Sequence, residues 1–426
     1  MRLCNSFFPC SHVSLLSGCP RPLTVSTASN TRFCQRYTWL MRILLACSLV
    51  VILHTPLRSA EDVPGIVEVK PADGRSVKVA GGFMIPYTVT IPGTDVTFRM
   101  EPIPGGEFVM GSAAAESGRE ECEGPQRKIT VEPFWMARCE VTWAEYKKYM
   151  RVYDAFKEFE EQGIRKVTDE NRVDAITAPT PLYEPDFTFE YGEDDQQPAV
   201  TVTVYSAKQY SKWLSAITGM QFRLPAEAEW EYACRAGSET AFYFGDDVAK
   251  LGDYAWFEGN SDDNGAKKVG QKRPNAWGLH DMHGNAAELV LDQFEPYAAG
   301  DGTLNASTDW VRTTKLDPRV VRGGSWQFAA TECRSASRFP SDSELWRESD
   351  PNLPKSPWWY TDDPSRGVGF RLIRPLKEVS REAMKEFWEF DNEDTKYDVE
   401  DRLAEGRGAQ GIVDRSLPAA IEKLNN

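Results

Sequence analysis

The sequence predicts a loop-rich fold built from short strands and a few capped helices. Thirteen Trp, 31 Gly and 27 Pro among 426 residues are typical of a loop-rich chain held together by aromatic anchors. Three segments carry helix-start signals, and short apolar runs between them are typical of strands. The hydrophobic content of 41% supports a real core, in one large domain or a few smaller ones.

Charge divides the chain unevenly. Residues 1–60 contain six Arg, no Lys and no acidic residue, so residues 61–426 carry 43 basic and 64 acidic side chains. A surface this acidic argues against nucleic acid and anionic membranes as partners. It is compatible with calcium or with basic partners.

The N-terminal region is typical of an export signal. Met41-Arg42 is a short positive region, and residues 43–53 form an apolar run too short to span a bilayer. Small residues then precede Glu61. We expect a signal peptide at 41–60, export to the periplasm or the extracellular space, and no transmembrane helix in the mature chain. Translation is expected to begin at Met41, which makes residues 1–40 a mis-assigned start or a disordered segment.

Export gives the cysteine count a meaning, because oxidising compartments allow disulfides. Five of the nine cysteines lie in residues 1–47 and would be removed. The other four could form any of three pairings or remain free thiols, and the sequence leaves this open. They are Cys122, Cys139, Cys234 and Cys333.

The mature chain begins with a lead-in at 61–94 that reads as strands. Residues 96–110 alternate and then turn at Pro104-Gly105-Gly106, which predicts a hairpin. Residues 131–141 are predicted to form a further strand. Thr142 and Glu145 form a capping box that predicts a helix through Tyr146, Tyr149 and Met150.

Two further helices are predicted. Ser206 and Gln209 form a second capping box, and the helix after them ends at Gly219. One face of that helix carries Tyr210, Trp213, Leu214 and Ile217. The third helix covers residues 227–235, with acidic residues in its first turn and Arg235 in its last.

Two segments look peripheral. Residues 160–198 are polar and Pro-rich, which predicts a long loop. The tail, 377–426, is highly charged, with one apolar stripe that predicts a single docking helix and a solvated or disordered remainder. The stripe consists of Val379, Ala383, Met384, Phe387 and Trp388.

Residues 319–338 concentrate the chemistry. Val320 and Val321 predict a strand, and Gly323-Gly324 then allows a sharp turn or a close backbone approach. Cys333 follows in a polar loop. A thiol beside a glycine turn could be a nucleophile or a soft-metal ligand, although spacing alone favours a core strand, a turn and a half-buried thiol.

Seven segments, in this order, resemble the formylglycine-generating enzyme family (sulfatase-modifying-factor domain). They are IPGGEFVMGS at 103–112, EVTWAEY at 140–146, FRLPAEAEWEYACRAG at 222–237, NAWGLHDMHGNAAE at 275–288, VVRGGSW at 320–326, CRSASR at 333–338 and GVGFRLIRP at 367–375. The resemblance covers about residues 95–376. It implies a compact α+β fold with low regular secondary structure, the formylglycine-generating-enzyme fold related to C-type lectins, a topology that periodicity alone does not give.

The resemblance also bears on copper. The family's oxidases convert a sulfatase cysteine in a Cys-x-Pro-x-Arg segment to formylglycine, using oxygen and copper(I). Two cysteines, three and eight positions after the serine of RGGS, hold the metal. Here that serine is Ser325, and the two positions are Phe328 and Cys333. A phenylalanine cannot ligate copper, so the two-cysteine site is incomplete.

Cys234 matches a position that the family uses in a structural disulfide, and the usual partner position is Arg338 here. A Cys234–Cys333 bridge is an open alternative. A related branch of the fold holds iron with three histidines. Only His280 and His283 remain in the mature chain, so we expect them to be packing or surface residues.

For calcium, the matching positions are Asp281, Gly284, Ala286 and Glu288. The resemblance implies two side-chain oxygens and two carbonyls as ligands, which suits a hard cation. The alternative is a glycine turn before a strand, with Glu288 solvated. A second family calcium site falls at 255–269, where Trp256 and Phe257 stand near ligand positions. Asp262, Asp263 and Asn264 lie nearby, and a plain acidic loop fits them equally well.

Two functions follow. In the first, the protein is an exported, calcium-stabilised binding or accessory module without the copper site. Its ligand, a protein or peptide (a sulfatase among the candidates) or a carbohydrate, would occupy a groove at Ser325 and Trp326. In the second, the protein is a formylglycine-generating oxidase with Cys333 as the remaining active-site thiol. The 160–198 insertion and the tail are candidate partner surfaces only because we expect them to be exposed.

Overall fold

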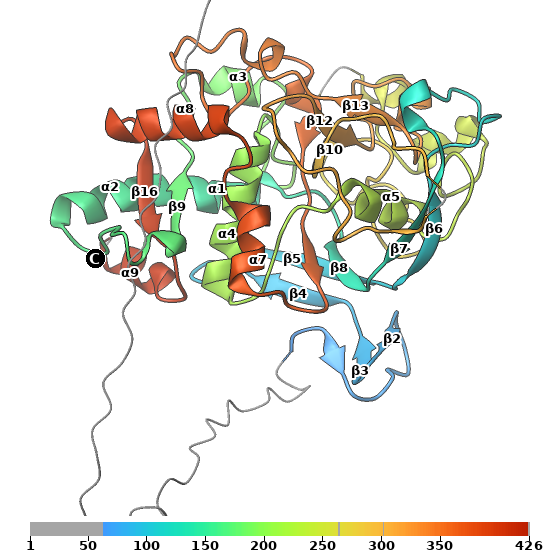
Figure 1. The fold of residues 1–426 in the computed structure, drawn as a ribbon, viewed down its shortest axis with the longest axis horizontal. Helices are drawn as coiled ribbons and strands as arrows, with labels where there is room; N and C mark the ends of the chain where they lie inside the picture. Colours follow the sequence, from blue (N-terminus) through green and yellow to red (C-terminus); the bar gives the residue numbers. More distant parts are fainter. Residues whose placement is uncertain (1–62, 263–264, 301, 425–426) are drawn as a thin grey trace, which may run out of the picture. The chain divides into compact units, whose positions relative to one another are not determined.

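The computed structural model describes residues 63–262, 265–300 and 302–424. The predicted signal peptide and the predicted false start lie outside these residues. Within them, many short strands are combined with a few helices, which confirms the α+β prediction. Figure 1 shows their arrangement.

The strands are β1 (Ile66–Val67), β2 (Val77–Val79), β3 (Gly82–Met84), β4 (Tyr87–Thr90), β5 (Thr97–Ile103), β6 (Gly106–Met110), β7 (Arg127–Val131), β8 (Phe134–Ala137), β9 (Ala175–Ala178), β10 (Ala287–Gln293), β11 (Leu304–Asn305), β12 (Arg319–Arg322), β13 (Arg338–Pro340), β14 (Val368–Gly369), β15 (Ile373–Pro375) and β16 (Ala409–Ile412). The α-helices are α1 (Trp143–Met150), α2 (Val152–Gln162), α3 (Pro185–Phe189), α4 (Val204–Thr218), α5 (Glu227–Arg235), α6 (Glu258–Ser261), α7 (Arg381–Trp388), α8 (Glu393–Ala404) and α9 (Leu417–Leu424). The 3-10 helices include η2 (Glu121–Glu123), η5 (Ala330–Cys333) and η7 (Ser365–Gly367).

Two four-stranded sheets organise the chain. One has the order β15-β8-β5-β4, and its strands are all antiparallel to their neighbours. The other has the order β13-β12-β10-β14, in which β14 runs parallel to β10. The second sheet brings the glycine turn after β12 and the predicted calcium loop before β10 to the same part of the molecule.

The predicted hairpin at Pro104–Gly106 is wrong. The strand before this turn, β5, pairs with β4 and β8, whereas the strand after it, β6, pairs with β7. Pro102 and Pro104 carry no N–H to donate across a hairpin ladder, so the chain turns a corner into another sheet here. The alternating pattern was correct for each strand separately.

The predicted helices are largely confirmed. Thr142 and Glu145 cap α1 reciprocally, and α5 covers residues 227–235 as expected. Helix α4 ends at Thr218 with Gly219 in the left-handed conformation, but its start was mispredicted. Thr203 is the N-cap and accepts from the N–H of Ser206, which lies inside the helix because Val204 and Tyr205 already form its first turn. The inner faces of α1 and α4 meet in an aromatic cluster of Tyr146, Tyr149, Tyr210 and Trp213.

The insertion and the tail form one substructure. Strand β9, from the insertion, pairs antiparallel with β16, from the tail, over four residues on each strand. Figure 1 shows the green insertion and the red tail side by side at one end of the domain. Helix α7 docks through Met384 and Phe387, as the apolar stripe predicted. The prediction of a solvated or disordered remainder is wrong, because α8, β16 and α9 continue the ordered chain.

Among the described residues, no helix has the length and apolar composition needed to cross a bilayer.

Candidate functional site

The glycine turn after β12 is built by close backbone approach. Gly323 and Gly324 have φ angles of 96° and 69°, a region that side chains with a Cβ disfavour. A Cβ on Gly324 would lie 2.6 Å from the Cys333 sulfur, and a Cβ on Gly323 would lie 3.0 Å from the Trp230 ring. The turn therefore packs directly on the thiol and on the indole.

A cavity of about 300 Å³ lies against this turn. Its wall includes Gly323, Gly324 and Phe328, with the partly exposed Cys122 among the other lining residues. Ser325 and Trp326, predicted to line a groove, are buried instead. Tyr191 from the insertion contacts Trp326 edge to face, with 4.7 Å between ring centroids. Any ligand in this cavity would therefore meet the glycine backbone and aromatic rings before these two side chains.

Cys333 lies beneath the turn. Its side chain is fully buried, and burial raises the pKa of its thiol well above the ordinary value. Phe328 packs edge to face on Phe339 in the cavity wall, with 5.1 Å between ring centroids. The donor set at the two family copper positions is thus one buried neutral thiol and one hydrocarbon ring. These residues do not fit a two-coordinate copper(I) ion.

All four described cysteines are free thiols, so no Cys234–Cys333 bridge is present among the described residues. Between these two cysteines lies His283, whose Nδ1–H donates to the Cys333 carbonyl oxygen over 2.8 Å. Its Nε2 accepts from the Tyr243 N–H over 3.1 Å. Burial lowers the pKa of His283 to about 3. With both nitrogens engaged, His283 is a packing residue, as expected.

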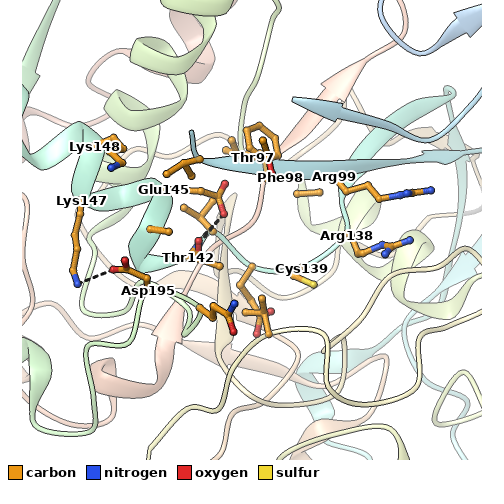
Figure 2. Close-up of a pocket in the computed structure, with 18 of the residues that line it drawn as sticks. Thr97, Phe98, Arg99, Arg138, Cys139, Thr142, Glu145, Lys147, Lys148 and Asp195 are labelled. Atoms are coloured by element: carbon orange, nitrogen blue, oxygen red, sulfur yellow. Dashed lines mark hydrogen bonds and ion pairs between the residues drawn. The ribbon is translucent and has the colours of Figure 1, made fainter. Parts of the chain in front are cut away.

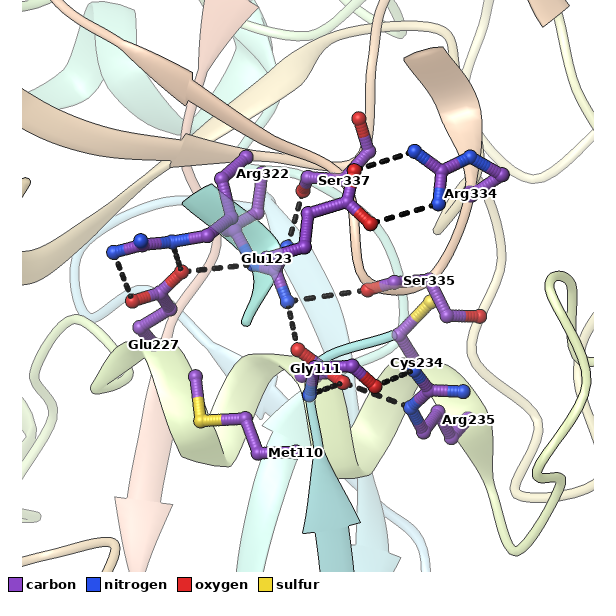
Figure 3. Close-up of polar contacts among 12 residues, drawn as sticks. Met110, Gly111, Glu123, Glu227, Cys234, Arg235, Arg322, Arg334, Ser335 and Ser337 are labelled. Atoms are coloured by element: carbon purple, nitrogen blue, oxygen red, sulfur yellow. Dashed lines mark hydrogen bonds and ion pairs between the residues drawn. The ribbon is translucent and has the colours of Figure 1, made fainter. Parts of the chain in front are cut away.

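A buried network of ion pairs lies in the wall of this cavity. Arg322, Arg334 and Arg338 line the cavity, and each pairs with at least one buried glutamate. Figure 3 shows Arg334 facing Glu123, and Arg322 pairs with Glu231 in the middle of α5. Arg338 donates to Glu227 from Nε over 2.6 Å and from Nη2 over 3.0 Å. These arginines therefore hold the wall together, and their charges are largely neutralised by protein carboxylates.

The predicted calcium residues lie in the loop before β10 and at its start. Glu288 accepts from Arg371 Nε over 2.8 and 2.6 Å, from Arg371 Nη2, and from the Trp230 indole over 2.7 Å. Its oxygens are therefore already occupied by N–H donors, and a guanidinium stands beside them. Asp281 lies nearby but keeps one oxygen without a partner. Of the two carboxylates predicted as calcium ligands, Glu288 is therefore already engaged by N–H donors, and only Asp281 has an oxygen without a partner.

The second predicted calcium site, at residues 255–269, also lacks a complete set of available ligands among the described residues. The Lys272 ammonium lies 3.8 Å from the centre of the Trp256 ring, which places a cation beside one expected ligand position. Asp262 ends α6 in the left-handed conformation. Asp263 and Asn264 lie outside the described residues. Across the part of the chain that the structure describes, no three His, Cys, Asp or Glu side chains gather as a metal site.

Sequence reasoning missed several residues that the fold brings together. Glu140 and Arg371 were quoted only as parts of the motifs EVTWAEY and GVGFRLIRP, yet both interact electrostatically with Asp281. Cys122 was noted only for disulfide pairing, yet it is the cysteine that lines the cavity. The only available signal for Glu140 and Arg371 was their place in ordered motifs, since their contacts join segments more than 130 residues apart.

Comparison with known proteins agrees with the order of motifs. A family model described as "Sulfatase-modifying factor enzyme 1-like domain" matches residues 94–375. The chain is 26% identical to "Formylglycine-generating enzyme" of Mus musculus over 263 residues, covering 55% of this chain and 68% of that protein. It is 29% identical to "Inactive C-alpha-formylglycine-generating enzyme 2" of Mus musculus over 254 residues, covering 53% and 74%.

One solved structure is similar over most of its length. PvdO from Pseudomonas aeruginosa is 29% identical, with a TM-score of 0.47, and the match covers 67% of this chain and 97% of that one.

Proposed function

This chain belongs to the family of the sulfatase-modifying factor enzyme 1-like domain and has the formylglycine-generating-enzyme fold, and from that premise we propose that it is a binding or accessory module. In this proposal the two-cysteine copper chemistry is lost, while the scaffold and its cavity at Gly323-Gly324 are kept. The proposed ligand is a protein or peptide segment that reaches the aromatic wall of the cavity.

The observation that carries the proposal is the state of the two copper positions. Phe328 occupies one of them with a ring that has no donor atom. Cys333 occupies the other with a thiol buried under Gly324, and burial favours its neutral form. Copper(I) binding needs thiolates, and activation of oxygen needs an open position near the substrate. Neither requirement is supported at these two residues.

The test is mass spectrometry of a sulfatase peptide that carries the Cys-x-Pro-x-Arg segment. The peptide is incubated with the purified protein, copper(I) and oxygen, and with an active formylglycine-generating enzyme in parallel. We expect no conversion of the peptide cysteine by this protein and full conversion by the active enzyme. An aldehyde product formed by this protein would overturn the proposal.

The second candidate function is a formylglycine-generating oxidase that uses Cys333. Its support is the similarity to a relative named for that activity. It requires Cys333 to become accessible, so a Cys333→Ser variant should then abolish any conversion in the same assay. A binding module predicts that the wild type and this variant behave alike, with no product from either.

Export and calcium stabilisation complete the proposal. Export rests on the signal at 41–60, and recovery of a secreted chain that begins at Glu61 would support it. The acidic balance of residues 61–426 suits a basic peptide partner, and sulfatases are the partner class that the family suggests. Calcium is compatible with the same excess of carboxylates, but the ligand set has to accommodate the Arg371–Glu288 pair.

A further inference from the structure

A cavity of about 640 Å³ lies between β5, the segment after β8 and helix α1. It has no lining residue in common with the cavity at Gly323-Gly324. Residues 61–426 carry 43 basic and 64 acidic side chains, so basic groups are the minority in this chain. The wall of this cavity, which we call the basic cavity, nevertheless gathers Arg99, Arg138, Lys147, Lys148 and Arg151.

Two arginines at one end of the basic cavity share a single carboxylate. Arg99 Nε and Arg138 Nε each donate to Glu101 Oε1 over 2.9 Å. Arg75 Nη1 lies 3.6 Å from Glu101 Oε2 and is a third cation in this cluster. The Glu101 side chain is 1% exposed, whereas those of Arg99 and Arg138 are 46% and 38% exposed. Three guanidinium groups around one buried carboxylate leave an excess of positive charge at this end.

Helix α1 supplies the cations of the other end. Figure 2 shows Lys147 and Lys148 there, opposite the two arginines. Lys147 donates to Asp195 Oδ1 over 3.1 Å, so its charge is neutralised in part. Lys148 and Arg151, which is the C-cap of the helix, form no ion pair among the residues that the structure describes. This end therefore also has cations without a protein anion.

The acidic side chains of the wall offset this charge only in part. Glu140 and Glu145 are 2% and 4% exposed, and both direct an oxygen to protein donors. Glu140 Oε1 accepts from Asn285 Nδ2 over 3.0 Å. Glu145 Oε1 accepts from the Thr142 N–H over 3.1 Å and from its hydroxyl over 2.8 Å. Burial raises the pKa of Glu145 to about 7, which reduces its negative charge at neutral pH.

The charge and the lining of the basic cavity suit an organic oxyanion. A guanidinium presents two parallel N–H groups to the oxygens of a carboxylate or phosphate, and an ammonium attracts the same groups as a point charge. The partly buried Phe98 also lines the cavity, and Figure 2 shows it between Glu145 and Arg99. A cavity of this volume accommodates a small molecule. Its carbon skeleton would pass the phenyl ring, and its oxyanions would meet cations at both ends.

We propose that the basic cavity binds a small organic molecule with two oxyanion groups, phosphate or carboxylate. One group is held by Arg99 and Arg138, and the other by Lys148 and Arg151. This site goes beyond the proposed binding module, because it lies apart from the cavity at Gly323-Gly324 and involves neither a peptide nor copper.

Calorimetric titration of the full chain, without copper or peptide, tests this site independently of the oxidase assay. Fructose 1,6-bisphosphate and adipate are the probes with two oxyanions. Fructose 6-phosphate and hexanoate are their controls with one oxyanion, and all titrations use the same ionic strength. We expect saturable binding of a two-oxyanion probe, about tenfold tighter than its control, because the control lacks one charge-assisted contact. The probe that binds more tightly identifies the preferred oxyanion.

Variants at both ends locate the binding. Arg99→Gln and Lys148→Gln should each weaken it about tenfold, and melting curves check that both variants stay folded. Asp195→Asn should tighten binding, because it removes the carboxylate that competes for Lys147. Lys250→Gln is the matched control, since this exposed lysine pairs with Asp247 outside the cavity, and it should leave binding unchanged.

Three results would overturn the proposal. The first is that neither two-oxyanion probe binds saturably, and the second is that a one-oxyanion control binds as tightly as its probe. The third is an equal effect of Lys148→Gln and Lys250→Gln, because binding would then follow the net charge of the chain and not this cavity.

Discussion

At the scale of single residues, the contact between Gly324 and Cys333 decides whether the thiol can meet a ligand. The backbone of Gly324 lines the cavity on one side and packs on the buried sulfur on the other. Only glycine combines the φ of 69° with this close approach. Gly324 is therefore a residue of the cavity wall, whereas Cys333 is not.

Gly324→Ala tests this packing. The added methyl group would strain the backbone and meet the sulfur at 2.6 Å, so we expect a loss of about 2–4 kcal/mol in the free energy of unfolding. Urea denaturation measures it. Gly81→Ala is the matched control, because Gly81 has a φ of 88° but nothing within 4 Å of an added Cβ. The control should lose only about 1 kcal/mol. Equal losses in the two variants would contradict the packing argument.

At the scale of secondary-structure elements, an ion pair joins the start of α5 to β13. Arg338 stands where the family resemblance implies a disulfide cysteine, and it reaches Glu227 on α5. Its guanidinium also lies 4.1 Å from the centre of the Tyr297 ring. A salt bridge with aromatic support thus connects the same two elements, α5 and β13, that a disulfide between positions 234 and 338 would join.

Glu227→Gln should destabilise the protein by about 3–5 kcal/mol at neutral pH, because it leaves Arg338 buried without its anion. Burial raises the pKa of Glu227, but Arg338 and Arg322 outweigh this and lower it below the ordinary value of 4.5. The folded state therefore binds this proton less well than the unfolded state. The difference in stability between wild type and variant should be full above pH 4.5 and shrink as the pH falls below it.

Chemical denaturation at a series of pH values measures this difference. Glu239→Gln, at an exposed position soon after α5, is the control and should change stability little at any pH. A Glu227→Gln penalty that stays constant down to acid pH would contradict the assignment.

The elements also show what sequence patterns can and cannot predict. Helices α1 and α5 were predictable because their caps and dipole charges are local. The pairing of β9 with β16 was not, because it joins residues more than 230 positions apart and neither strand is strongly apolar. The corner between β5 and β6 reads as a hairpin until the partner of each strand is known.

At the scale of the whole molecule, the same division holds for the candidate site. The glycine turn and the substitution of Phe328 could be read from ordered motifs. The pairing of Glu288 with Arg371, and the position of Cys122 in the cavity wall, depend on contacts between distant segments. Burial of Trp326 depends in part on the insertion, whose Tyr191 packs edge to face on its ring. Motif order therefore identified the family, while side-chain availability required the assembled fold.

The tail packs on the rest of the domain and should contribute to its stability. Asp391 pairs with Lys208 of α4 over 3.1 Å and with Arg319 of β12 over 2.6 Å, so the segment after α7 is anchored to two parts of the domain. Phe387 covers the Arg223 guanidinium, 4.6 Å from its ring centre. A chain that ends at Leu376 would lose these contacts and would leave β9 without its strand partner.

We therefore expect the chain that ends at Leu376 to melt at least 10 °C below the full chain, or to be insoluble, because removing several buried contacts together costs a large share of a domain's stability of about 5–15 kcal/mol. Circular dichroism melts and limited proteolysis measure this. Asp391→Asn is a milder change, because it keeps the tail but removes its ion pairs with Lys208 and Arg319. In this variant we expect protease to cleave the tail before it cleaves the rest of the domain. Asp394→Asn, at an exposed position in the same segment, is its control. If the shortened chain melts like the full one, the tail is an appendage, and its pairing with the insertion contributes little to the stability of the fold.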